Sequence, residues 1–370
     1  MENTEKMPLR SWLPVVGLAC TAFVFNTSEF IPIGLLTDIG ADFNMSTAET
    51  GMLISIYAWV VMTMSLPLMI LASRMEMRRL MLTLIATFAL FQFMSSVSTS
   101  FYMLLAARIG GAFAHSVFWS IVSPMAARIV SGRMIGLMLG WRMTFLTIGI
   151  VAVTTFIYMF LTLPVVPSRG KFSVKKLPVL FKNKPLMGIF ILTIFFATSY
   201  YTCYSYIEPF MKQITGMSDS LVTASLMSFG ASGIVGSFAF SKFYNAHRFP
   251  FLTILLAIIA ACIFLVLPAA FSIEVTFAVL ALWGFAGTAF NVAMQDEIIK
   301  FAPQDGTAVA MSIFSGIFNF GIGTGAFIGG LVCTNLSLSY VGIVGGFIAL
   351  GTLAYWLLKL KGYMKAFYGC

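Results

Sequence analysis

Residues 251–271 read FLTILLAIIAACIFLVLPAAF, a run of 21 positions without a charged side chain. A helix needs roughly 20 apolar residues to cross a hydrocarbon layer about 30 Å thick, because backbone amides cannot stay unpaired in lipid. Ten other stretches meet the same test, covering approximately residues 13–36, 51–71, 80–97, 103–130, 143–163, 186–206, 221–240, 275–294, 307–332 and 340–358. The sequence therefore predicts an all-α membrane protein with about 11 spanning helices.

The composition leaves no room for a soluble domain beside the membrane part. Of 370 residues, 59% are hydrophobic and 9% are charged, against about 25% charged in ordinary globular domains. The net charge of +9 comes from basic residues in short loops between the apolar stretches, so we expect them to set the membrane topology and not to bind nucleic acid. The cysteines lack metal-ligand spacing, which predicts neither a disulfide framework nor a metal site, and no cofactor is expected.

Five apolar stretches precede a basic central loop and six follow it. The loop, residues 167–185, holds six lysine or arginine residues, which the positive-inside rule places in the cytoplasm together with Lys6 and Arg10. We therefore expect an N-terminal helical bundle over residues 1–166 and a C-terminal six-helix bundle over residues 186–370.

The charges disagree with the number of stretches, because five full spans would place the central loop on the opposite side from the N-terminus. In SGRMIGLMLGWR, residues 131–142, the apolar part would rise about 12 Å as a helix, which is too short to cross. The corresponding stretch of the second half carries Gly321, Gly325 and Gly329 at a spacing typical of a close helix-packing face. The sequence thus indicates that the fifth helix of the first half is absent, and it leaves the topology of residues 131–163 open.

Four blocks, in this order, carry a family resemblance: AFAHSVFWS from Ala112, GWRMTF from Gly140, YSYIEPF from Tyr204 and SGIFNFGIGTGA from Ser315. Together they resemble bacterial sugar efflux transporters of the drug:proton antiporter branch of the major facilitator superfamily. The resemblance covers almost the whole chain. It implies a two-bundle fold in the bacterial inner membrane, usually as a monomer without enzymatic activity. It also implies export of sugars or similar small polar solutes in exchange for protons by alternating access.

The chain departs from the family at two places. The family's gating motif after the second span combines glycines, an acidic residue and basic residues, and here only its basic end remains, at Arg74, Arg78 and Arg79. The family's fifth span, which packs the two halves together, has no counterpart. A second interpretation therefore stays open, an internally deleted membrane protein that transports nothing. Export of drugs in place of sugars is a third.

Charged and titratable groups inside a bilayer are costly, which makes them candidates for function. At a rise of 1.5 Å per residue, Glu29 lies about 24 Å from the inner end of its span and Arg108 about 8 Å from the outer end of its own, so their depths match. The resemblance places both spans beside the central cavity and allows an ion pair, either structural or proton-coupled. His115 lies two turns after Arg108 on the same face and is a candidate proton site, unless it only binds a neighbouring side chain.

The stretch over residues 186–206 ends in an aromatic cluster. Tyr201, Tyr204 and Glu208 share one helix face, and Tyr200 lies beside them. Tyrosines offer ring faces and hydroxyls, which suits a sugar, although an aromatic belt at the outer membrane boundary is an alternative interpretation. Further candidates for substrate contact are Asn26, Trp119, Asn291 and Asn319.

Other classes of membrane protein fit less well. The sequence has no GxxxxGK[ST] loop, which an ATP-driven pump would need. Its acidic residues lie mostly at loop edges, which disfavours an intramembrane enzyme. A passive channel would leave the two halves unexplained.

Overall fold

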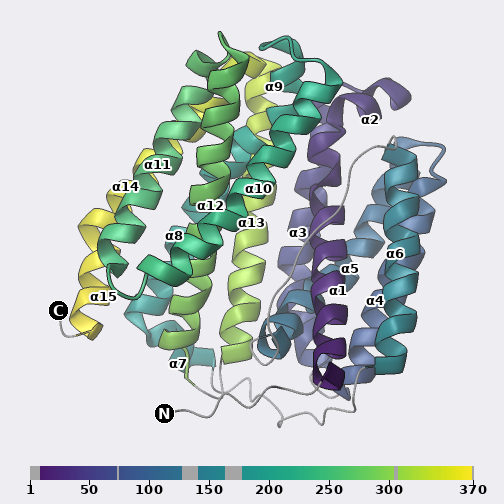
Figure 1. Cartoon of the computed structure of the whole chain (residues 1–370), viewed down its shortest axis with the longest axis vertical. Coiled ribbons are helices and arrows are strands. Elements are labelled where there is room, and N and C mark those ends of the chain that lie inside the picture. Colours follow the sequence, from purple (N-terminus) through teal and green to yellow (C-terminus); the bar gives the residue numbers. More distant parts are fainter. Residues whose placement is uncertain (1–8, 73–74, 127–140, 163–176, 304–306, 369–370) are drawn as a thin grey trace.

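The computed structural model describes residues 9–72, 75–126, 141–162, 177–303 and 307–368, and these residues form helices and turns without a strand (Figure 1). The first group of helices comprises α1 (Leu9–Gly34), α2 (Leu36–Phe43), α3 (Thr47–Ala72), α4 (Met77–Ser96), α5 (Phe101–Ala126) and α6 (Trp141–Thr162). The short α7 (Leu177–Lys182) precedes the second group. This second group comprises α8 (Lys184–Tyr204), α9 (Ile207–Gln213), α10 (Asp219–Phe243), α11 (Arg248–Ala269), α12 (Ile273–Phe301), α13 (Thr307–Asn335), α14 (Val341–Tyr355) and α15 (Lys361–Tyr368).

The described helices have the length and composition of membrane spans. Nine of the described helices, some of them built of consecutive elements, are long and apolar enough to cross a bilayer, and α1 with α2, bent by 64° at Leu35, makes ten if this pair is counted as one span. The described apolar part of α6, Gly149–Thr162, is shorter. The prediction of an all-α membrane fold is confirmed for the described residues, and their nine or ten candidate spans are roughly consistent with the expected number of about 11.

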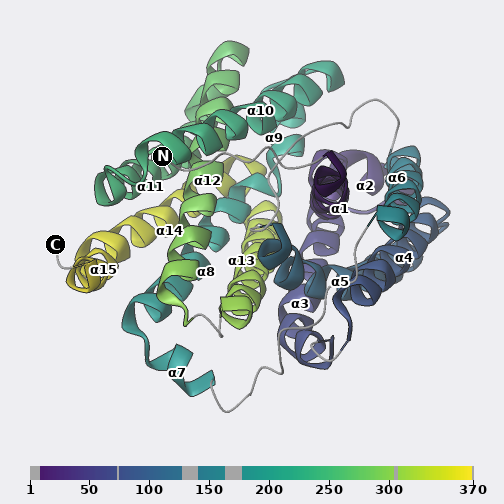
Figure 2. The same cartoon turned by 60° about the horizontal axis from the view of Figure 1, so that its bottom comes forward.

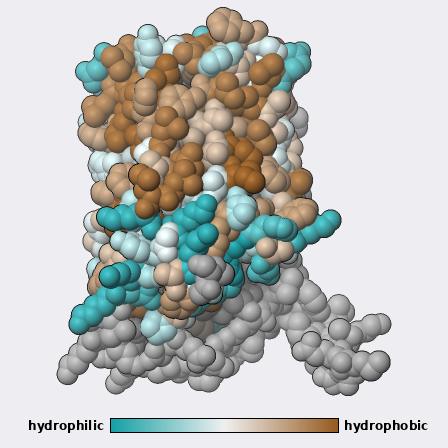
Figure 3. Space-filling model, turned by 90° about the vertical axis from the view of Figure 1, so that its left-hand side faces the viewer, coloured by the Kyte–Doolittle hydropathy of each residue, from teal (hydrophilic) through white to brown (hydrophobic). Residues whose placement is uncertain are grey.

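The surface of the second group is apolar over most of its height. Figure 3 shows hydrophobic side chains covering this side, with hydrophilic side chains gathered toward its lower end. Phe238, Phe347 and Leu358 are among the large apolar residues that remain exposed. Helices that are hydrophobic all round require a lipid environment, so this face is the one that contacts the acyl chains.

The helices pack in two groups side by side, as Figures 1 and 2 show. In the first group, α4 packs against α5 and α6, and α3 packs against α5. In the second, α8 packs against α13 and α14, α10 against α12, and α11 against α12 and α14. The long seam between the groups is formed by α13, which packs along α3 and α5 on one side and along α8 on the other.

Glycines allow α13 to lie close to both neighbours. A Cβ on Gly325 would lie 2.6 Å from the carbonyl oxygen of Thr198 in α8, and one on Gly323 would lie 2.5 Å from the ring of Trp59 in α3. Gly321 and Gly329 also face α8. The sequence pattern of Gly321, Gly325 and Gly329 thus lies on the face that α13 turns toward α8, where the backbones approach without side chains between them.

The direction of α6 is fixed by its contacts with α4. Phe160, near the end of α6, accepts a hydrogen bond of 2.6 Å from Arg78 at the start of α4, whereas Gly149 faces the ring of Phe93 near the end of α4. The two helices are therefore antiparallel. Because α5 is also antiparallel to α4, with Gly110 against Phe91, α5 and α6 run in the same direction. We call the end where α4 begins the inner end, because basic residues such as Arg78, Arg248 and Lys300 lie there.

Candidate functional site

A pocket of about 120 Å³ lies between the two groups of helices. It is lined from α1 by Asn26, Glu29 and Phe30, from α12 by Asn291 and Gln295, and from α13 by Met311, Phe314, Ser315, Phe318 and Asn319. Amide groups and one carboxylate thus meet phenylalanine and methionine side chains at the centre of the molecule. A small solute with both hydroxyl groups and apolar surface matches this lining.

Glu29 and His115 lie together beside this pocket. The Nε2 atom of His115 is 3.6 Å from the Oε2 atom of Glu29, and its Nδ1 atom is 2.8 Å from the hydroxyl of Tyr57 in α3. Exposure is 6% for Glu29, 0% for His115 and 2% for Tyr57, so these groups are shielded from bulk solvent on all sides. If Tyr57 donates to Nδ1, the proton of the neutral imidazole sits on Nε2 and points toward the carboxylate.

Arg108 reaches the main chain of α1 from α5. Its Nη1 donates to the carbonyl of Ser28 at 2.7 Å and its Nη2 to the carbonyl of Glu29 at 3.2 Å. Pro32 has no N–H, so the carbonyl of Ser28 lacks its usual donor within the helix, and Arg108 replaces it. The guanidinium carbon also lies 4.3 Å from the centre of the Tyr57 ring, a favourable cation–π geometry.

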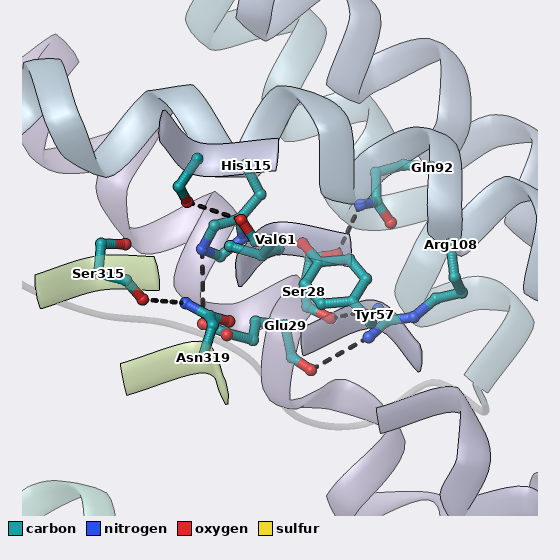
Figure 4. A network of polar contacts seen from close by, with 10 residues as sticks. Ser28, Glu29, Tyr57, Val61, Gln92, Arg108, His115, Ser315 and Asn319 are labelled. Carbon is teal, nitrogen blue, oxygen red and sulfur yellow. Dashed lines mark hydrogen bonds and ion pairs between the residues drawn. The ribbon is translucent and has the colours of Figure 1, made fainter. Parts of the chain in front are cut away.

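Figure 4 shows how these residues form one network across the helices of the first group. The amide Nε2 of Gln92 in α4 donates to the hydroxyl of Ser28 at 2.5 Å. Glu29 and Arg108 are neighbours, as their matched depths predicted, but the two hydrogen bonds from the guanidinium go to the backbone of α1. The carboxylate of Glu29 faces His115 and, beyond it, Asn319 of the second group.

Two acceptor atoms of residues that line the pocket are buried without a hydrogen-bond partner among the described residues, namely Oε1 of Glu29 and Oδ1 of Asn319. The Nδ2 atom of Asn319 is already used, since it donates to the carbonyl of Ser315 at 3.0 Å. Asn291 likewise accepts a hydrogen bond of 2.6 Å from Gln295. Buried acceptors are costly when unsatisfied, so this pocket favours a ligand that brings its own donors.

The tyrosines predicted to contact substrate form a buried aromatic cluster. Tyr204 stacks on Phe229 at 4.7 Å, and Tyr200 lies 4.9 Å from the ring of Trp283. Neither is in the lining of the pocket. Tyr201 stacks on Phe30 at 5.8 Å and so links α8 to α1, which places it closest to the pocket wall.

The remaining predicted residues lie elsewhere. Glu208 is fully buried in α9 near the outer end, where it accepts hydrogen bonds from Thr37. Trp119 is part of α5, but its side chain lies outside the described part of the structure, as does Arg74. Arg78 and Arg79 begin α4 at the inner end, where the carboxylate of Glu76 accepts from both of their backbone N–H groups.

Sequence reasoning missed four members of the network: Ser28, Pro32, Tyr57 and Gln92. Each occurs singly in an apolar stretch, and each acquires its role only from the neighbouring helix. The proline three residues after Glu29 was the one available signal, because it frees a carbonyl at a known position. Within the described residues, no group of three or more histidine, cysteine, aspartate or glutamate side chains could hold a metal ion.

Comparison with known proteins shows which family the chain belongs to. The sequence model of the Major Facilitator Superfamily matches residues 18–140 and residues 130–312. A bacterial homologue of the human lysosomal transporter Spinster, inward-facing and unoccupied, superposes with a TM-score of 0.74 at 14% identity, over 98% of this chain and 99% of that one. The occupied form of that homologue superposes with a TM-score of 0.70 at 16% identity, over 96% of this chain and 97% of that one. The human organic anion transporter MFSD10 (TETRAN) gives 0.70 at 12% identity, over 95% and 100%. At these identities the likeness to solved structures shows the fold alone.

Proposed function

This chain belongs to the major facilitator superfamily and is a transporter, and from that premise we propose that it exports sugars or similar small polar solutes in exchange for protons. The observation that carries the proposal is the pocket between the groups, where the buried carboxylate of Glu29 meets His115 and the amide of Asn319. A pocket of about 120 Å³ is smaller than the roughly 300–1,000 Å³ of pockets for drug-sized ligands, which favours a small solute.

In this proposal, the solute is exchanged for a proton because both compete for the carboxylate of Glu29. When Glu29 is ionised, its Oε1 and the Oδ1 of Asn319 both need donors, and the hydroxyl groups of a sugar supply them. When Glu29 takes a proton, the carboxyl group has a donor of its own and binds solute less well. His115 lies between Glu29 and Tyr57 and is placed to pass this proton. Alternation of the pocket between the two membrane faces then couples proton entry to solute exit.

The tyrosine cluster has a supporting role in this proposal. Tyr201 forms the wall behind Phe30, while Tyr200 and Tyr204 fix its position through the aromatic packing around Trp283. Asn26 and Asn291 add amide groups at the rim of the pocket. The basic residues Arg78 and Arg79 anchor the inner end of α4 and belong to the cytoplasmic face.

We also propose that α6 is the family's sixth helix and that its fifth has been lost. Neighbouring helices of such bundles alternate in direction, yet α5 and α6 are parallel, as they would be if one helix between them were absent. With this direction α6 ends at the inner end, so the basic run after it meets the positive-inside rule. The two bundles would then be residues 1–166 and residues 186–370, in a monomer of the bacterial inner membrane.

The test uses purified protein in liposomes with a pH-sensitive dye inside. Neutral mono- and disaccharides, organic cations and organic anions are added one at a time across an imposed pH gradient. We expect saccharides to drive proton movement in the wild type. The control variant Glu49→Gln should behave in the same way, because Glu49 is exposed and its carboxylate accepts hydrogen bonds from the neighbouring Ser46 at the start of α3. Glu29→Gln should remove the proton movement without lowering the yield of folded protein. If no compound moves protons in the wild type, the transport-inactive interpretation stands, and a response to cations alone would favour drugs.

A further inference from the structure

Two short helices meet at the outer end of the molecule, one from each group. The helix α2 comes after the break at Leu35 that ends α1, and α9 comes after a break at Ser205 and Tyr206 that ends α8. Figure 1 shows α2 and α9 at the same, upper end of the molecule. Each is thus the outer continuation of the first long helix of its own group.

The contact between them is polar and specific. The carboxylate Oε2 of Glu208 accepts hydrogen bonds from the backbone N–H of Thr37 at 3.2 Å and from its hydroxyl at 2.9 Å. The ammonium of Lys212 lies 3.3 Å from Asp38 of α2 and 2.9 Å from both Glu208 and Asp219. We call these five residues, Thr37, Asp38, Glu208, Lys212 and Asp219, the outer clasp.

The two groups contribute residues to the outer clasp, and to an aromatic contact beside the pocket, at matching sequence spacings. Phe30 lies seven residues before Thr37, and Tyr201 lies seven residues before Glu208. The rings of Phe30 and Tyr201 stack at 5.8 Å with an angle of 14° between their planes. In both groups, the aromatic contact next to the pocket therefore lies before the helix break, and the polar contact of the outer clasp lies beyond it.

The charges of the outer clasp suit a contact that opens reversibly. Lys212 has one partner on the first group, Asp38, and two on its own group, Glu208 and Asp219. If the groups separate at this end, the ammonium keeps two carboxylates and the buried carboxylate of Glu208 keeps an ammonium. Separation therefore leaves no buried charge unpaired. An unpaired buried charge would be energetically costly and would keep the contact closed.

We propose that the outer clasp is the outer gate of the transport cycle and that it is closed in this structure. This inference rests on the alternating access in the proposed function, but it does not depend on which solute or ion is carried. Opening would break the two hydrogen bonds from Thr37 and the ion pair to Asp38, and it would unstack Phe30 from Tyr201. The break at Leu35 allows α2 to move with respect to α9 without unfolding α1.

The gate can be tested without knowing the substrate. A single cysteine at Asn26, which is exposed and lines the pocket, is placed in a cysteine-free background and labelled from outside with an impermeant thiol reagent. We expect the pair Thr37→Val and Asp38→Ala to raise the outside labelling rate severalfold. The matched control is Asp296→Asn, which removes an ion pair to Lys300 within α12, far from the outer clasp. Unchanged labelling in a folded Thr37→Val, Asp38→Ala protein would overturn the proposal.

A second measurement covers the case in which that variant fails to fold. Cysteines at Asp38 and Lys212, joined by a short bifunctional reagent, should stop outside labelling at position 26 and leave labelling from the inner side unchanged. Continued outside labelling after cross-linking would contradict the gate. If labelling responds as expected but Glu29→Gln has no effect on proton movement, the gate stands and the proposed coupling fails.

Discussion

Arg108 donates a hydrogen bond of 2.7 Å to the carbonyl of Ser28, which Pro32 leaves without a donor inside its own helix. The interaction joins α5 to α1 shortly before the break at Leu35. Arg108 thus pairs a backbone carbonyl that has no other donor in its helix. Removing the Arg108 side chain would leave that carbonyl unpaired in a medium without water.

This relationship predicts a compensating pair of substitutions. Arg108→Met should lower the free energy of unfolding by about 1–3 kcal/mol through the unsatisfied carbonyl alone. Adding Pro32→Ala should recover part of this loss, because the new N–H can bond to Ser28. Thermal unfolding in detergent measures the effect. Pro268→Ala in α11 is the control, and its effect should add to that of Arg108→Met without recovery. Equal results for the two prolines would contradict the assignment.

The contact of 2.8 Å between Tyr57 and His115 predicts coupled losses of transport. Tyr57→Phe removes the hydroxyl that holds the imidazole, so proton-driven efflux should fall while the folded yield is retained. If the Tyr57 hydroxyl acts only through the imidazole of His115, Tyr57→Phe should lower efflux no further in a His115→Gln background. The initial rate of efflux is measured for both single variants and the double variant. Tyr363→Phe, at an exposed site in α15, should leave the rate unchanged. Additive losses would show that the two side chains act independently.

The close contact of α13 with α8 predicts a strong response to a single methyl group. A Cβ at Gly325 would lie 2.6 Å from the oxygen of Thr198 and 2.9 Å from the nitrogen of Thr202, so Gly325→Ala should cost about 1–3 kcal/mol of stability. At Gly351 in α14 a Cβ would meet nothing within 4 Å, and Gly351→Ala should be neutral or slightly stabilising. Melting temperatures of both variants, measured in the same detergent, provide the comparison. A similar change in both would contradict the packing described.

The direction of α6 predicts that α7 lies on the cytoplasmic side of the membrane. A single cysteine at Phe181, half-exposed in α7, should be protected from an impermeant thiol reagent in intact cells and labelled once the cells are permeabilised. A cysteine at Phe271, which is 96% exposed between α11 and α12, should be labelled in intact cells. The reverse pattern would mean that the second group is inverted, and proton-coupled export would then be excluded.

Much of the fold could be predicted from the sequence, because the long apolar stretches leave few alternatives in lipid. Depth counting also placed Glu29 and Arg108 at the same level, since helical rise is nearly constant, but it placed His115 two turns deeper and did not predict the contact of His115 with Glu29. The lateral register between helices could not be predicted, because apolar side chains on all faces do not reveal which face meets which neighbour. Tyr57 and Gln92 were missed for this reason.

The break after α8 explains a further difference between sequence and structure. Spacing placed Glu208 on the same helix face as Tyr201 and Tyr204, which presumes an uninterrupted helix. In the structure the helix stops at Tyr204, and Glu208 belongs to α9, where it faces Thr37. The sequence YSYIEPF gives no strong signal for this break. The contact depends on α2, whose own break at Leu35 was equally unforeseen.

The seam along α13 determines where the two groups stay in contact when the outer clasp opens. The seam of α13 with α3 and α5 joins the two groups, and the outer clasp joins their outer ends. If the outer clasp opens while the seam holds, the groups rotate about an axis that crosses the seam, because a rotation about the length of α13 would open both ends at once. Distances between labels should therefore stay nearly constant between α3 and α13 at mid-height and change most between the outer ends of α6 and α11.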